Sequence, residues 1–170
     1  MTTFEKLKNT NTWAEFKYGD ILQESDLNYL IHQANCYCCM GAGIAKQLAD
    51  KYPIVTEVDN TTVRGNYNKL GTYTIANISD NFKIVNLYSQ YLPGRACTAN
   101  EINNSLHAIK TGLTSLKLEI KATTKSTVII GFPWLIGCGI YGLDETTVFN
   151  IIKSVFEFEP LFTIKFIKFK

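Results

Sequence analysis

The sequence lacks the features of a secreted, membrane-spanning or nucleic-acid-coating protein. No apolar run approaches the ~20 residues that cross a bilayer. The first residues, MTTFEKLKNTNTW, contain no apolar stretch of the kind found in signal peptides. Neither sign of charge dominates, because 17 Lys and Arg against 15 Asp and Glu give a net charge of +2. We therefore expect a cytoplasmic protein that has neither a membrane nor a nucleic acid as its partner.

Internal repeats, low-complexity tracts and linkers are also absent. The 170 residues are 46% hydrophobic and 19% charged, which is an ordinary globular balance and excludes a disordered tail protein. This length corresponds to one domain. We expect a single domain over residues 1–170, with a core from about residue 13 to residue 170.

The cysteines form neither a disulfide framework nor a metal site. Their number is odd, and three of the five fall within four positions, which is a poor framework for pairing. The Cys-x-Cys-Cys motif has no second cysteine pair and only two histidines that could complete a zinc site. We expect reduced, partly buried thiols and no metal. The cysteines are Cys36, Cys38, Cys39, Cys97 and Cys138.

Alternating strand and helix patterns predict a layered α/β domain. Strands are expected at 13–18, 29–34, 71–77, 82–88, 126–132 and 163–169, and helices at 44–52, at 100–120 and after an N-cap at Asp144. The segments 71–77 and 82–88 are too close for a helical crossover, so the sheet should be mixed. We expect segment 54–70 to be irregular. The final lysines are expected to protect an edge strand or to solubilise the terminus.

Two glycine-rich loops each lie between an expected strand and an expected helix: Met40-Gly41-Ala42-Gly43 and Ile136-Gly137-Cys138-Gly139-Ile140-Tyr141-Gly142. Such loops let backbone N–H groups approach a ligand, and a helix N-terminus favours anions, so the pair could clamp a diphosphate. Helix–strand packing also selects glycine and is the alternative reading. The P-loop motif is absent, and Lys46 replaces the third glycine of a dinucleotide fingerprint, which disfavours a Rossmann dehydrogenase.

From about residue 17 to residue 169 the motifs resemble those of macrodomains. Gly19-Asp20-Ile21 resembles the opening motif of that family, and Ile31-His32-Gln33-Ala34-Asn35-Cys36 followed by the first glycine loop resembles its asparagine-and-glycine signature. Gly131-Phe132-Pro133 with the second loop resembles the second phosphate loop. The most similar subgroup is the ADP-ribose-1″-phosphate phosphatase-like macrodomains of yeast and phages, near the deglycosylase branch.

The resemblance implies a three-layer α/β/α fold with a mixed central sheet of about six strands, binding ADP-ribose. Asp20 and the Ile21 N–H would contact the adenine, Asn35 the distal ribose, and Tyr141 would shield that ribose. The two loops would cradle the diphosphate through Gly41, Ala42, Gly43, Ile44, Gly137, Cys138, Gly139, Ile140 and Tyr141. Each side chain also has a simpler reading: Asp20 as a turn residue, Asn35 as a cap, and Tyr141 as packing.

The resemblance implies catalytic roles for His32, Asn35 and Asp144. His32 lies in an expected strand, where a core histidine is the alternative, and Asp144 needs no role beyond an N-cap. Gln90 stands where the deglycosylase branch has its lysine, and an amide cannot form a Schiff base. Tyr141 stands where that branch has an aspartate, so the covalent deglycosylase mechanism is disfavoured.

The leading hypothesis is hydrolysis of ADP-ribose-1″-phosphate to ADP-ribose and phosphate, without a metal or cofactor. A non-catalytic ADP-ribose-binding module, a glycohydrolase acting on ADP-ribosylated macromolecules and an unrelated nucleotide-binding domain are the alternatives. The similarity to phage proteins makes the cytoplasm of a host cell the expected compartment if the chain is viral. The oligomeric state is left open.

Overall fold

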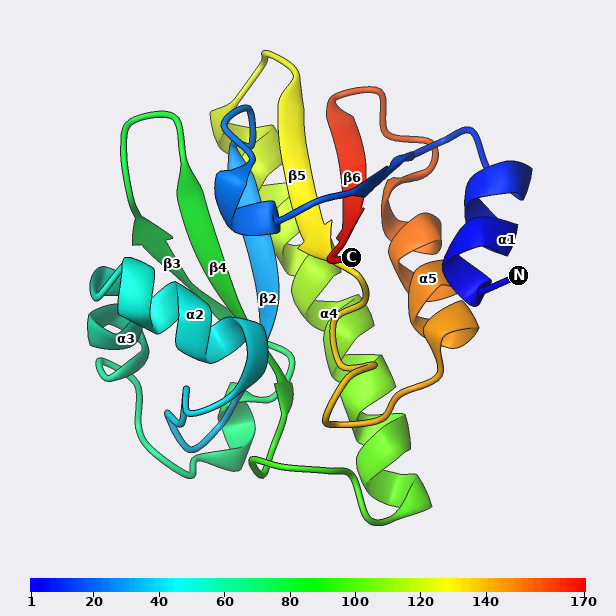
Figure 1. Cartoon of the computed structure of the whole chain (residues 1–170). Coiled ribbons are helices and arrows are strands. Elements are labelled where there is room, and N and C mark those ends of the chain that lie inside the picture. The colour runs from blue at the N-terminus through cyan, green and yellow to red at the C-terminus, as the bar shows by residue number, and fades with distance from the viewer.

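The framework of the fold is one six-stranded sheet in the order β1-β6-β5-β2-β4-β3 (Figure 1). A computed structural model describes residues 1–170. β3 runs antiparallel to β4, and all other neighbouring strands are parallel, so the sheet is mixed as expected. The strands are β1 (Glu15–Tyr18), β2 (Tyr29–Asn35), β3 (Tyr73–Asn77), β4 (Lys83–Gln90), β5 (Val128–Pro133) and β6 (Phe162–Lys168).

Helices cover both faces of the sheet and complete the expected three-layer α/β/α fold. The helices are α1 (Thr3–Thr10), α2 (Gly43–Lys51), α3 (Ile54–Asp59), α4 (Ala99–Thr123) and α5 (Glu145–Phe156). The apolar sides of α1, α4 and α5 join one large cluster of buried residues, whereas α2 and α3 pack into a separate one across the sheet (Figure 1). None of these helices combines the length and apolar character that a membrane-spanning segment needs.

The long helix α4 shows how local sequence sets an element. Thr98 caps its N-terminus by accepting a hydrogen bond from the Glu101 N–H, and the Glu101 carboxylate accepts one from the Thr98 N–H in return. The apolar stripe predicted from the sequence supplies the buried side, including Ile109, Leu113 and Leu116.

One expectation about the elements was wrong, and one of the two alternatives for the final lysines is excluded. Segment 54–70 is not irregular, since it contains α3 and a 3₁₀ turn at Tyr67–Lys69. α3 begins directly after Pro53, a residue whose fixed φ suits the start of a helix, and buries Val55 against the sheet. The last strand is not at an edge, because β6 lies between β1 and β5. Helix α1, which the sequence analysis did not anticipate, brings the fully buried Phe4 into the main core.

The strand order positions the glycine loops. β2 and β5 are parallel neighbours, so the loops that follow them leave the sheet at the same edge. The first loop leads from β2 into α2, and the second leads from β5 into α5. Two motifs about 100 residues apart in sequence are thereby brought together.

Candidate functional site

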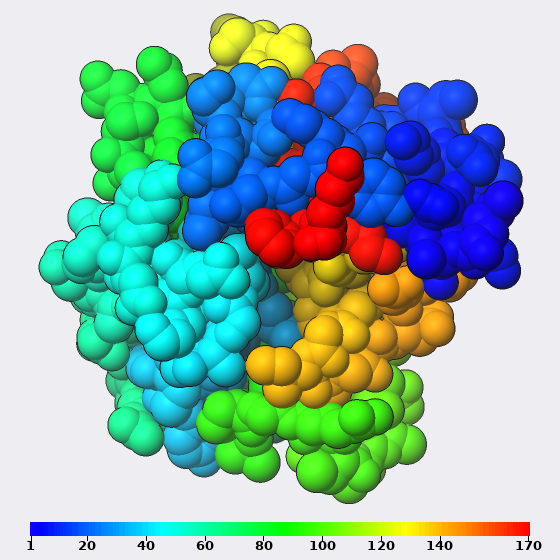
Figure 2. Space-filling view, viewed as in Figure 1, coloured from blue at the N-terminus to red at the C-terminus, as the bar shows by residue number.

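A cleft of about 540 Å³ opens between the two glycine loops. Figure 2 shows the hollow between the α2 region, in cyan, and the second loop, in gold, with the C-terminal residues in red along its rim. This volume lies in the range of small-molecule sites. The predicted binding residues that line it are Asn35, Gly41, Ala42, Gly43, Ile44, Gly137, Gly139, Ile140 and Tyr141.

The loops approach each other closely across the cleft. A Cβ atom at Gly43 would lie 3.9 Å from Ile140 Cδ1. Gly43 has φ +58° and Gly137 has φ +75°, and both values favour glycine. At Gly137 a Cβ would lie only 2.6 Å from Leu143 Cδ1, so the second loop also needs glycine for space.

Backbone N–H groups without acceptors lie on both glycine loops. Ala42 precedes α2 and provides no side-chain cap, so the N–H groups of Gly43 and Ile44 have no acceptor within the chain. The N–H groups of Gly139, Ile140 and Tyr141 also donate no hydrogen bond within the chain. No lining side chain carries a formal charge. A bound anion would therefore be held by backbone dipoles and the N-terminus of α2.

The N-terminus of α5 differs from that of α2 because Asp144 occupies it. The Asp144 carboxylate accepts hydrogen bonds from the Thr147 N–H at 2.8 Å and from the Thr147 hydroxyl at 2.7 Å. These bonds hold the pKa of Asp144 below its usual value. Asp144 is exposed and does not line the cleft. Asp144 therefore lies where the N-cap of α5 is expected, and the structure does not place it at the cleft with Asn35.

His32 is completely buried on the opposite face of β2, away from the cleft. Its Nε2 lies 2.6 Å from Asn86 Oδ1, and the Asn86 amide donates to the Val55 carbonyl of α3 at 3.1 Å. Burial lowers the pKa of His32, although Asn86 and Asp59 oppose the shift. His32 is thus a fully buried core histidine that does not line the cleft.

Asn35 lies at the cleft and organises the first loop. Its Oδ1 accepts hydrogen bonds from the N–H groups of Tyr37 at 3.0 Å and Cys39 at 3.2 Å. Its Nδ2 donates to the Cys39 carbonyl at 2.7 Å. These contacts fit the cap reading and hold the loop that leads to Gly41.

Three other predicted residues do not line the cleft. Asp20 caps a 3₁₀ turn (Ile21–Gln23) by accepting the Leu22 N–H at 2.9 Å. Ile21 is 5% exposed and packs in the core cluster shared with α2 and α3. Cys138 is half-buried, and burial raises its pKa to about 12.

The sequence analysis missed several residues that line the cleft. Gln33 is one of them, and its Nε2 is buried without a hydrogen-bond partner in the chain. It precedes Asn35 by two positions, so the alternation of a strand would have placed it on the same face as Asn35 and opposite His32. Trp134 lines the other side, and its indole N–H donates to Glu145 Oε1 at 3.1 Å.

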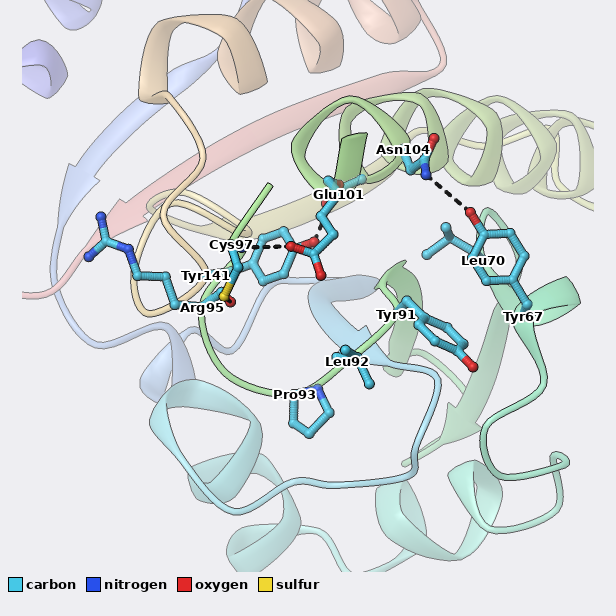
Figure 3. Close-up of a pocket in the computed structure, with 11 residues that line it drawn as sticks. Tyr67, Leu70, Tyr91, Leu92, Pro93, Arg95, Cys97, Glu101, Asn104 and Tyr141 are labelled. Atoms are coloured by element: carbon cyan, nitrogen blue, oxygen red, sulfur yellow. Dashed lines mark hydrogen bonds between the residues drawn. The ribbon is translucent and has the colours of Figure 1, made fainter. Parts of the chain in front are cut away.

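A smaller hollow of about 170 Å³ adjoins the cleft and shares Pro93 and Tyr141 with it (Figure 3). Tyr141 is 6% exposed, and its hydroxyl donates to the Glu101 carbonyl at 3.3 Å. The rings of Tyr67 and Tyr91 meet edge to face on the other side of this hollow, with centroids 5.0 Å apart. Tyr141 is therefore a fixed wall residue that borders both spaces.

Comparison with solved structures identifies the architecture around this cleft. The macrodomain of Mycobacterium tuberculosis DarG has a TM-score of 0.68 at 22% identity, covering 91% of this chain and 97% of that one. A macrodomain protein from Streptomyces coelicolor has a TM-score of 0.64 at 15% identity, covering 90% and 98%. Thermosipho africanus DarTG, solved in complex with ADP-ribose, has a TM-score of 0.65 at 16% identity, covering 91% and 41%.

The chain has the macrodomain fold. No family model matches it. Among curated proteins, 69 residues are 35% identical to the uncharacterized 17.5 kDa protein in the tk-vs intergenic region of Enterobacteria phage T4. That match spans 38% of this chain and less than half, 44%, of the phage protein.

Proposed function

We propose that the cleft of this macrodomain fold binds ADP-ribose, with the diphosphate between the N-terminus of α2 and residues 139–141. The observation that carries this proposal is the pairing of two sets of N–H groups without acceptors, on loops that face each other across the cleft. Such a pair suits a ligand with two adjacent phosphates. ADP-ribose is the ligand in the Thermosipho relative, which supports this choice.

The ends of the ligand are assigned from the resemblance. Asp20 would accept a hydrogen bond from the adenine amino group through Oδ2, because Oδ1 already accepts from the Leu22 N–H. The Ile21 N–H would lie beside this contact. Asn35 and Tyr141 would border the distal ribose. Ile44 and Ile140 would cover the diphosphate from opposite sides.

Hydrolysis of ADP-ribose-1″-phosphate is the candidate reaction, and the cleft favours binding over fast turnover. Its lining side chains include amides, the Cys39 thiol and the Tyr141 phenol, but no carboxylate, lysine or histidine. His32 and Asp144 lie outside it. Gln90 lines the cleft with its amide donating to the Gly94 carbonyl at 2.9 Å, and an amide cannot attack the distal ribose as a lysine would. Proton transfer would then depend on water, so we expect slow phosphate release.

The sharpest test of binding places a carboxylate where the phosphate should lie. Ala42 has the extended backbone of an N-cap, so Ala42→Asp should cap α2 as Asp144 caps α5. We expect a stability gain of about 1 kcal/mol together with loss of ADP-ribose affinity in calorimetry. Gln47→Asp adds the same charge on an exposed position of α2 that does not line the cleft. If Ala42→Asp and Gln47→Asp bind ADP-ribose equally well, the diphosphate does not lie at this helix.

The reaction is tested separately by incubating the protein with ADP-ribose-1″-phosphate and quantifying both phosphate and ADP-ribose. Tight ADP-ribose binding with little phosphate release would support a binding module. Rapid release that Ala42→Asp abolishes would establish the phosphatase instead. Release of ADP-ribose from a modified macromolecule would select the glycohydrolase.

A further inference from the structure

A buried amine lies beneath the first loop, outside the cleft. Lys69 is 6% exposed, and none of the ion pairs in the chain includes it. Its Nζ donates to the Cys36 carbonyl at 3.2 Å and lies 4.4 Å from the centre of the Tyr88 ring. Burying an ammonium without a paired carboxylate is costly. The other polar neighbour in contact with Lys69 Nζ is therefore a candidate for a functional partner.

That neighbour is the thiol of Cys38, whose Sγ lies 3.3 Å from Lys69 Nζ. The same sulfur lies 3.4 Å from the Asp59 carbonyl and 3.5 Å from the Thr62 hydroxyl. Cys38 has φ +55°, and no other residue except glycine has a positive φ. Because the Asn35 side chain binds the backbone on both sides of Cys38, this sulfur is held against the amine.

The other thiols lack this arrangement. Cys36 is fully buried, and burial raises its pKa to about 11. Cys97 is exposed and contacts only the Arg95 carbonyl through its sulfur. Cys38 alone combines partial exposure with a lysine nitrogen in contact. Thiols beside an ammonium react well with peroxides because the thiolate is the nucleophile.

We propose that Cys38 and Lys69 form a peroxide-reactive pair that closes into a reversible sulfur–nitrogen cross-link. In the first step the Cys38 thiolate attacks hydrogen peroxide, the O–O bond breaks, and the departing hydroxide takes a proton from the Lys69 ammonium to form water, which leaves a sulfenic acid beside a neutral amine. In the second step the neutral Lys69 amine attacks that sulfur, the S–O bond breaks, and the departing hydroxide takes a proton from nitrogen to form water. The sulfur loses two electrons to the peroxide, and the second step needs no further oxidant.

The cross-link would restrain the first glycine loop, which forms one wall of the cleft. Residues 36–39 connect β2 to the glycines of the first loop, and Cys39 lines the cleft directly. Lys69 ends the 3₁₀ turn before β3. Joining Cys38 to Lys69 therefore fixes the base of the first loop to a separate part of the fold. The chemistry itself does not depend on which ligand the cleft binds.

The test treats the reduced protein of residues 1–170 with hydrogen peroxide and analyses its peptides by mass spectrometry. We expect a Cys38–Lys69 peptide pair whose mass is the sum of the two peptides minus two hydrogens, and its loss after dithiothreitol. Cys97→Ser should retain the pair, and Cys38→Ser should abolish it. Lys69→Arg keeps the charge without a nucleophilic amine, so Cys38 in that variant should be trapped by dimedone as a sulfenic acid.

Three results overturn the proposal. One is a wild-type Cys38 that accumulates as sulfenic or sulfinic acid without linkage to Lys69. Another is a disulfide of Cys38 with Cys36 or Cys39 as the main product. The third is oxidation of Cys97 at peroxide concentrations that leave Cys38 reduced. All three are read from the wild-type protein, so they do not depend on whether a variant folds.

Discussion

Gly137 is the position where one added methyl group should damage the cleft most directly. Its φ of +75° is unfavourable for any residue with a Cβ, and that Cβ would lie 2.6 Å from Leu143 Cδ1 and 3.0 Å from Gln33 Nε2. Leu143 is 4% exposed, so it has little room to move. Gly137→Ala must therefore strain the backbone, displace Leu143 or do both.

The expected loss follows from these two causes. A left-handed backbone costs ~1–2 kcal/mol for a residue with a Cβ, and overpacking a close contact adds ~1–3 kcal/mol. We expect Gly137→Ala to lower the free energy of unfolding by about 2–5 kcal/mol. For a chain of this size the melting temperature should fall by roughly 4–20 °C.

Gly139→Ala is the matched control in the same loop. A Cβ at Gly139 meets no atom within 4 Å, and its φ lies outside the positive range. We expect this variant to melt like the parent in calorimetry and in urea titrations. The reasoning is refuted if Gly137→Ala is as stable as Gly139→Ala. Adding Leu143→Ala to Gly137→Ala should give a smaller loss than the two single changes together, because it removes the nearer contact.

Three further predictions concern the residues that the resemblance assigned. In calorimetry, Asp20→Ala should weaken the binding of ADP-ribose without changing the binding of ribose 5-phosphate. The control Asp80→Ala, in an exposed turn, should change the binding of neither ligand. An equal loss of affinity for both ligands in Asp20→Ala would argue against adenine recognition. His32→Ala should cost about 2–4 kcal/mol of stability by removing a buried ring and the partner of Asn86, yet leave the affinity of the folded protein unchanged. A loss of affinity at unchanged stability would restore a direct role for His32. Hydrogen bonds from Thr147 lower the pKa of Asp144 in the folded protein. The Asp144 carboxylate therefore stabilises the fold fully above its unfolded pKa, and this stabilisation is lost as the pH falls through its folded pKa. The stability difference between the parent and Asp144→Ala should thus be constant near neutral pH and shrink as the pH falls below the unfolded pKa of ~3.9, and a difference that stays constant into this acidic range would contradict the cap.

Much of the fold could be predicted because its signals are local. The apolar stripe on α4, the alternation in β1 and the cap at Asp144 each depend on residues within a few positions of one another. The close spacing of β3 and β4 required an antiparallel pair. The helix in segment 54–70 escaped prediction because α3 is short, begins directly after a proline and gains its stability by packing Val55 on the sheet.

The sequence by itself determined which positions can form tight turns with unpaired N–H groups, because glycine can adopt a positive φ wherever it occurs in the chain. Only the tertiary structure decided which turns meet, because β2 and β5 become neighbours through strand pairing across about 100 residues. Strand alternation by itself puts His32 and Gln33 on opposite faces of β2, but only the packing of the sheet decided that His32 is buried under α3 and that Gln33 lies beside the cleft. It also brought Lys69 against Cys38, a contact that long-range packing creates and that neither local segment specifies.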